Sequence, residues 1–232
     1  MQLAIQVCNY LIALPLEVLI IAALLRGPYR RFPVIFVYTI AYFLTTVAEI
    51  PVYIACYSGI RSACGSRVFL YWLDEGILQL LIFAVVMSLI YEASARVVSR
   101  RLMRAGLIAG AMVFAGVSFL VHYNAHAPLS RWMTPWMRDL SFCSTILDLA
   151  LWSLLIAARK KDHLLLMLSG ALGIQFTGEA IGEALRNLSN SAIIVNAGDM
   201  LIVISDFVAL YIWWQAFRRA AVLKGPQQLP SS

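Results

Sequence analysis

The sequence predicts an all-α membrane protein, a single bundle of seven transmembrane helices. Of its 232 residues, 62% are hydrophobic and only 13% are charged, and the mean hydropathy is +0.81. These values lie well outside the range of soluble domains. Seven apolar stretches are each long enough to cross a hydrocarbon core about 30 Å thick as a helix. They lie at about residues 3–25, 34–56, 69–91, 103–121, 140–158, 164–185 and 192–217. Lipid offers no hydrogen-bond partners to the backbone, so helices are expected rather than open strands.

Positive charge is distributed unevenly between the loops and predicts the topology. Thirteen of the 18 Lys and Arg residues fall on one side of the predicted spans and five on the other. Positively charged loops stay in the cytoplasm, so we expect the N-terminus outside and the C-terminus inside, in the plasma membrane. Residues 1–219 then form one transmembrane domain and 220–232 a short cytoplasmic tail. The net charge of +6 indicates anionic lipid headgroups at the cytoplasmic collar as partners, and no nucleic acid.

The first predicted span carries a polar stripe that indicates contact with protein rather than lipid. Gln6, Tyr10, Ala13 and Glu17 recur at helical spacing, and Pro15 predicts a kink beside the acid. A cleaved signal peptide is the alternative interpretation. The stretch lacks a basic beginning and a small-residue cleavage pattern, so we expect it to remain as a helix.

The second and third spans repeat the pattern of acids among apolar residues. Proline at Pro33 suits the first turn of the second helix. A narrow arc of that helix holds Tyr38, Tyr42, Thr45, Glu49 and Tyr53. In the third span, Asp74 and Glu75 project from adjacent faces, and Glu75 shares a face with Gln79.

The fourth span carries no charge between residues 107 and 121 and is rich in small residues. Gly106-x3-Gly110 and Gly116 predict close packing against a neighbouring helix. After it, His122 and His126 would share a helix face, as metal ligands often do, if the helix continued. Pro128 and the polar residues around it favour a fraying end instead, so these histidines are weak metal candidates and no metal site is predicted.

The last three spans add further polar stripes. Asp148 lies in the fifth span. The sixth holds Gln175, Glu179 and Glu183 beside Gly178-x3-Gly182, and one face of the seventh holds Asn196, Asp199 and Asp206. A carboxylate in hydrocarbon costs several kcal/mol, so each acid must be paired, protonated or bound to a ligand.

The depth of the acids separates them into two groups. The outer group lies within reach of outer arginines, and Arg186 follows Glu183 and Glu179 on their own stripe, so a salt-bridged rim is a structural use for them. Glu17, Asp148 and Asp206 lie nearer the middle, where no Lys, Arg or His shares their depth. Burial would keep these three neutral and hydrogen-bonded, unless a cation or water supplies a partner. They are the sharper functional candidates.

Four cysteines fall on the predicted outer side, which is oxidising. Cys56 and Cys64 would close one outer loop as a disulfide, and the alternative is that all four are unpaired and behave as small apolar residues. No C-x-x-C motif is present. The predicted seventh span lacks the lysine that retinal requires, and the histidines do not converge within the membrane as intramembrane hydrolases require. We therefore expect no cofactor and no enzymatic activity.

Two longer patterns bear on architecture. Acid spacings in the first three spans are similar to those in the last three, which predicts a 3+1+3 arrangement of parallel halves, as in some small transporters. Arg31-Phe32-Pro33, together with Tyr71-Trp72 and Glu75, resembles a group of uncharacterised bacterial seven-helix membrane proteins. That resemblance covers about the first half of the chain. It implies a membrane location and no particular activity.

These observations favour a binding or sensing protein whose acid-lined polar cavity opens to the outside. Its output would pass to a partner protein, or it would act as a homo-oligomer, since the predicted tail is short. The alternative is a transporter of a cation, a proton or a cationic solute, in which Glu17, Asp148 and Asp206 continue the path from the outer acids.

Overall fold

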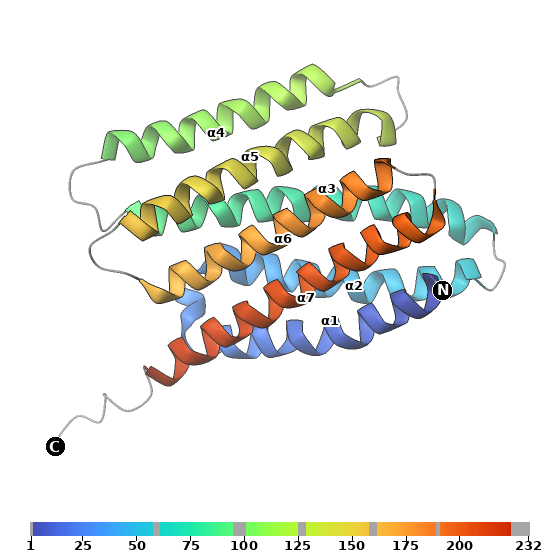
Figure 1. Cartoon of the computed structure of the whole chain (residues 1–232), viewed down its shortest axis with the longest axis horizontal. Coiled ribbons are helices and arrows are strands. Elements are labelled where there is room, and N and C mark those ends of the chain that lie inside the picture. The colour runs from blue at the N-terminus through green and yellow to red at the C-terminus, as the bar shows by residue number, and fades with distance from the viewer. Residues whose placement is uncertain are drawn as a thin grey trace. The chain divides into compact units, whose positions relative to one another are not determined.

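The computed structural model describes residues 2–57, 61–94, 101–124, 129–157, 162–188 and 191–223, and these residues form helices without any strand. The prediction of an all-α fold is therefore confirmed over these residues. The described residues form seven α-helices and one short 3-10 helix, and Figure 1 shows how they follow one another along the chain. They are α1 (Gln2–Leu25), η1 (Pro28–Arg30), α2 (Pro33–Tyr57), α3 (Arg61–Ser94), α4 (Arg101–His122), α5 (Leu129–Ala157), α6 (His163–Leu188) and α7 (Ala192–Leu223).

Five helices contain a segment that is long and apolar enough to cross a membrane. These segments are Pro33–Val52, Leu73–Ser94, Arg131–Ala157, His163–Arg186 and Ala192–Ala220. α1 and α4 contribute shorter apolar segments, Tyr10–Leu25 and Ile108–His122. The chain is therefore a membrane protein by the length and composition of its helices.

The chain divides into two compact units. The first comprises Met1–Thr39 and Trp152–Ser232, so that α1, the beginning of α2, α6 and α7 belong together. The second comprises Ile40–Leu151, which holds the rest of α2, α3, α4 and most of α5. Each unit brings its own set of polar side chains together, and we describe each separately.

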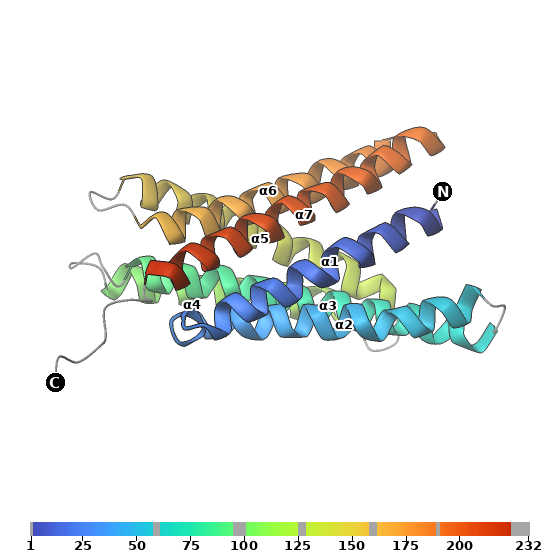
Figure 2. The same cartoon turned by 90° about the horizontal axis from the view of Figure 1, so that it is seen from below.

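In the first unit, α6 and α7 run in opposite directions and pack at unusually close range (Figures 1 and 2). Their crossing has no room for side chains at Gly178, Gly182 and Gly198. A Cβ atom at Gly178 would collide with Ser205, and one at Gly198 would lie 2.7 Å from the carbonyl oxygen of Gly182. The Gly178-x3-Gly182 packing expected from the sequence is present, and its partner is α7.

The turn between α1 and α2 depends on one glycine. Gly27 has a φ of 141°, a backbone conformation that side-chain-bearing residues rarely adopt, and its N–H donates to the carbonyl oxygen of Leu24 at 3.1 Å. Pro28 and Pro33 then begin η1 and α2, where the absence of an N–H costs nothing. The buried residues Ala13, Glu17, Ile20 and Leu24 lie along one face of α1, and α1 packs against α7.

In the second unit, α3 packs on α5 through Gly76, where an added Cβ would lie 2.6 Å from Met133 Cε. Phe119 of α4 meets Trp136 of α5 edge-on, with ring centroids 5.3 Å apart. The glycines of α4 behave differently from those of α6. Gly106, Gly110 and Gly116 have no neighbouring atom within 4 Å of an added Cβ, so the close packing expected for them is not seen among the described residues.

Candidate functional site

Four polar side chains of the first unit converge around one buried tyrosine. We call this group the Tyr38 cluster; its members are Glu17, Tyr38, Gln175, Glu179 and Asp206. Tyr38 is 5% exposed and Glu17 is fully buried, while the other three are half-buried. Gln175 hydrogen-bonds the hydroxyl of Tyr38, and the carboxyl groups of Asp206, Glu179 and Glu17 all act electrostatically on that hydroxyl. The cluster thus draws on α1, α2, α6 and α7.

Helix geometry explains why the members of α6 meet the same tyrosine. Gln175 and Glu179 are four residues apart, so they lie on one face of α6, one turn from each other. Gln175 Nε2 donates a hydrogen bond of 3.4 Å to Glu179 Oε1. The close α6–α7 crossing at Gly178 and Ser205 places Asp206 beside this face. The glycine packing is therefore part of what assembles the cluster.

An aromatic contact holds Tyr38 in place. Its ring meets Trp213 of α7 edge-on, with centroids 5.8 Å apart and an interplanar angle of 70°. Trp213 is 2% exposed, and its Nε1–H donates to the carbonyl oxygen of Leu168 in α6 at 3.3 Å. A buried indole N–H needs such an acceptor. One tryptophan therefore connects α2, α6 and α7 beside the carboxyl groups.

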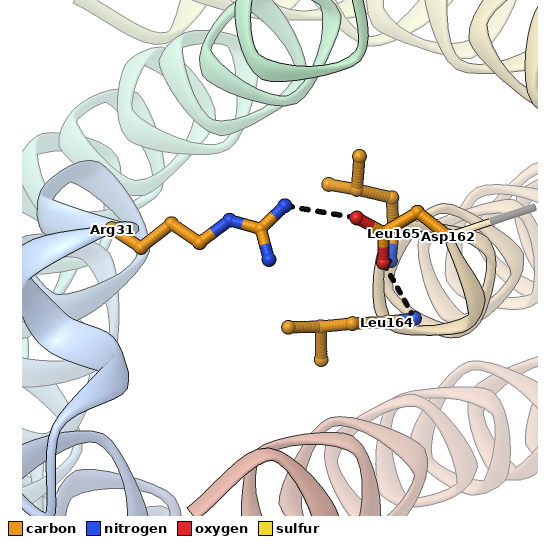
Figure 3. Close-up of polar contacts among 4 residues, drawn as sticks. All are labelled: Arg31, Asp162, Leu164 and Leu165. Atoms are coloured by element: carbon orange, nitrogen blue, oxygen red, sulfur yellow. Dashed lines mark hydrogen bonds and ion pairs between the residues drawn. The ribbon is translucent and has the colours of Figure 1, made fainter. Parts of the chain in front are cut away.

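An ion pair lies at the end of the first unit where α6 begins. Arg31 Nη2 donates to Asp162 Oδ2 at 2.9 Å (Figure 3). The other carboxylate oxygen of Asp162 accepts the backbone N–H groups of Leu164 at 3.1 Å and Leu165 at 3.4 Å, which makes Asp162 the N-cap of α6. The same carboxylate therefore caps one helix and joins it to the turn before α2. Sequence reasoning missed this pair, because its partners are 131 residues apart.

A second ion pair lies toward the other end of α6. Arg186 Nε is 3.3 Å from Asp199 Oδ1 of α7, with 50% and 30% of the two side chains exposed. Arg186 was predicted to form a salt bridge with acids of its own stripe. The observed pair joins it to the neighbouring helix instead, and Glu183 is exposed.

The second unit holds a smaller group of polar side chains. Thr45 of α2 hydrogen-bonds Asp74 of α3. The carboxyl group of Glu49, one turn further along α2, interacts electrostatically with the Asp74 carboxyl group. Asp74 Oδ1 is buried and has no hydrogen-bond partner among the described residues, and the same holds for Gln79 Nε2. Thr45 and Glu49 share the stripe predicted from the sequence, and this part of the stripe lies beside Asp74 of α3.

The remaining predicted site residues are distributed over both units. Asp148 is 3% exposed on α5, in the second unit. Glu75 is exposed, whereas Tyr42 and Asn196 are half-buried. The carbonyl oxygen of Tyr42 accepts hydrogen bonds from Thr45 and Thr46. The side chains of Tyr53, Cys56, Cys64 and His126 lie outside the described residues, and so the predicted disulfide does too.

His122 interacts with a carboxylate. Its Nε2 lies 3.0 Å from Asp139 Oδ2, which also accepts a hydrogen bond of 2.7 Å from Ser118. These residues join α4 to α5 beside an aromatic group that includes Phe119 and Trp136. Within the described part of the chain, no three His, Cys, Asp or Glu side chains are arranged to hold a metal ion. Cys143, on α5, is a free thiol.

Comparison of the chain with protein-family models, with curated proteins and with solved structures finds no match. The arrangement of side chains must therefore carry any functional argument. The three carboxyl groups are not arranged to coordinate a metal ion, but they offer negative charge to an organic cation and exchangeable positions to a proton.

Proposed function

We propose that the chain is a plasma-membrane protein that binds a cation or a cationic solute at the Tyr38 cluster and signals its occupancy to a partner protein. In this proposal all seven helices cross the membrane, with the N-terminus outside and the C-terminus inside, and the cluster is reached from the outer side. One observation carries the proposal. Carboxyl groups from three helices, α1, α6 and α7, interact electrostatically with the same buried tyrosine hydroxyl.

The electrostatics of the cluster support a cationic ligand. The three carboxyl groups bring negative charge toward one buried hydroxyl, and such an accumulation of like charge disfavours their joint ionisation. A bound cation or a proton reduces this repulsion, and the effect is larger in a low-dielectric surrounding. Tyr38 and Trp213 add aromatic surface next to the acids, which suits an organic ammonium group.

Ligand-dependent stability of the purified full-length protein in detergent tests this proposal. Because binding to the folded state alone stabilises it, we expect Tm to rise with tetramethylammonium, and to rise more than with Na⁺ or K⁺ at the same concentration. Glu17→Gln, Asp206→Asn and Tyr38→Phe should each reduce the rise. Glu183→Gln is the matched control, since it removes an exposed carboxylate of the same α6 helix. The proposal fails if no probe shifts the wild type, or if the cluster variants respond as the control does.

Transport is the second candidate function, and the ion pairs favour it. The Tyr38 cluster lies between Arg31–Asp162 and Arg186–Asp199, which occupy opposite ends of α6. Glu179 follows Asp162 by 17 residues and precedes Arg186 by seven, or about 26 Å and about 10 Å along a helix. One ion pair on each side of the Tyr38 cluster could break in turn, which suits alternating access from the two sides of a membrane.

Flux into proteoliposomes separates the two functions. A sensor binds its ligand without moving it, whereas a transporter collapses an imposed pH or cation gradient. In the transport scheme, Glu17, Asp148 and Asp206 continue the path from the outer acids, as the sequence predicts, and the first three and last three helices form the proposed 3+1+3 repeat. Asp148→Asn and Asp206→Asn should then abolish flux without loss of expression. Unaltered flux in both variants would exclude that path.

A further inference from the structure

Arginines and aromatic rings gather where η1 and the last turns of α7 meet. We call this group the arginine–aromatic patch; its members are Arg26, Tyr29, Arg30, Trp214, Arg218 and Arg219. η1 contacts α7, and the rings of Phe32 and Phe217 lie 6.1 Å apart between the two elements. Figures 1 and 2 both show the end of α7 beside this turn. The four arginines are exposed, and the two rings are half-buried.

Two of the arginines are held by aromatic neighbours. The Arg218 guanidinium lies over the Trp214 ring, 5.5 Å from its centroid. Arg30 lies 5.8 Å from the centroid of Tyr29, and its Nε donates to the Tyr29 hydroxyl at 3.1 Å. Stacking on a ring restricts a guanidinium and leaves its remaining N–H donors free for a ligand. The planar fork of these donors matches a phosphate group.

The described carboxylates do not balance the positive charge of the patch. Arg31, next to it, forms its ion pair with Asp162. Among the residues that the structure describes, no carboxylate pairs with Arg26, Arg30, Arg218 or Arg219. Four exposed positive charges within one turn and one helix end therefore have no counter-ion among the described carboxylates, which makes the patch a site for an anion.

The depth of the patch points to the source of that anion. One membrane-spanning segment begins at Pro33, two residues after Arg31, and another ends at Ala220, directly after Arg219. Tyr and Trp are typical of the boundary between hydrocarbon and headgroups. The patch therefore lies at the level of lipid phosphates.

From these observations we propose that the arginine–aromatic patch binds the phosphate group of an anionic phospholipid in the leaflet at this end of the helices. Arg30 and Arg218 bind the phosphate oxygens, Arg26 and Arg219 add positive charge, and Tyr29 and Trp214 contact the glycerol and upper acyl region. The proposal does not depend on the function of the Tyr38 cluster.

Native mass spectrometry of the full-length protein, mixed with equal amounts of phosphatidylglycerol and phosphatidylcholine, tests this proposal. We expect the protein to retain phosphatidylglycerol preferentially. An arginine near an anionic headgroup contributes about fivefold to affinity, so the variant Arg30→Gln/Arg218→Gln should bind it about 25-fold more weakly. The matched control is Arg131→Gln/Arg138→Gln, which removes two exposed arginines of α5 and should leave retention unchanged.

Two further arms distinguish a built site from general attraction. Arg30→Lys/Arg218→Lys keeps the charge but loses the planar fork, so it should still lose part of the binding. Inorganic phosphate should not compete at equal concentration if the ligand is a lipid. The proposal would be overturned if the protein retained both lipids equally, or if the α5 control lost as much binding as the patch variant. It would also be overturned if the lysine variant bound like the wild type, or if inorganic phosphate displaced the lipid.

Discussion

Replacing Gly182 by alanine tests whether the α6–α7 crossing is as close as the structure shows. An added Cβ would collide with Ile202 and lie 2.8 Å from the carbonyl oxygen of Gly198, where ordinary contacts begin at 3.4 Å. The Ile202 side chain is able to rotate, but the carbonyl is backbone, so the helices must separate by about 0.6 Å. A gap of this size forfeits a quarter or more of the dispersion energy of the contacts around it.

The expected magnitude combines two opposing effects. Overpacking at a close contact costs about 1–3 kcal/mol, and the better helix propensity of alanine returns about 1 kcal/mol. We therefore expect Gly182→Ala to lower the free energy of unfolding by about 1 kcal/mol, measured by reversible unfolding in mixed detergent micelles.

Gly110→Ala on α4 is the matched control. An added Cβ there has no neighbour within 4 Å, so only the propensity term applies and the change should stabilise the protein. If Gly182→Ala is as stabilising as Gly110→Ala, the close crossing is refuted.

The other predictions use the same unfolding measurement. Gly178→Ala should destabilise the protein by about 1–3 kcal/mol, because the added Cβ collides with Ser205. Adding Ser205→Gly should restore most of this loss, and no recovery in the double variant would mean that the two positions do not face each other. Asp162→Ala should lower the free energy of unfolding by about 1 kcal/mol, because α6 loses its N-cap. Asp162→Asn keeps a capping oxygen and removes only the ion pair with Arg31, so equal losses in the two variants would argue against the cap.

Helix positions in this chain were predictable because each depends on a local pattern. The apolar stretch at 34–56 became α2, Pro33–Tyr57, and the stretch at 164–185 became α6, His163–Leu188. Length and hydropathy suffice for such elements, since lipid leaves the backbone no alternative. The stripe from Thr45 to Glu49 was also predictable, because helical spacing determines which side chains share a face.

Partners across helices were not predictable, because sequence spacing does not say which faces meet. Gly178-x3-Gly182 and Gly106-x3-Gly110 are the same motif, yet only the first contacts a neighbouring helix in the described part of the chain. Arg186 lies within reach of Glu183 along its own helix, and it pairs instead with Asp199, which the antiparallel path of α7 brings closer. Tertiary packing decides both cases.

The packing of α1 against α7 has a consequence for how the protein is made. The buried face of α1, with Glu17 at its centre, is completed by a helix that is synthesised after the five helices between them. Asp206 emerges 189 residues after Glu17, which is about 10 to 40 s later at usual rates of translation. During that interval the carboxyl group of Glu17 lacks the part of its protein environment that α7 supplies. Although α1 is synthesised early, it would then be among the last helices to reach its final place.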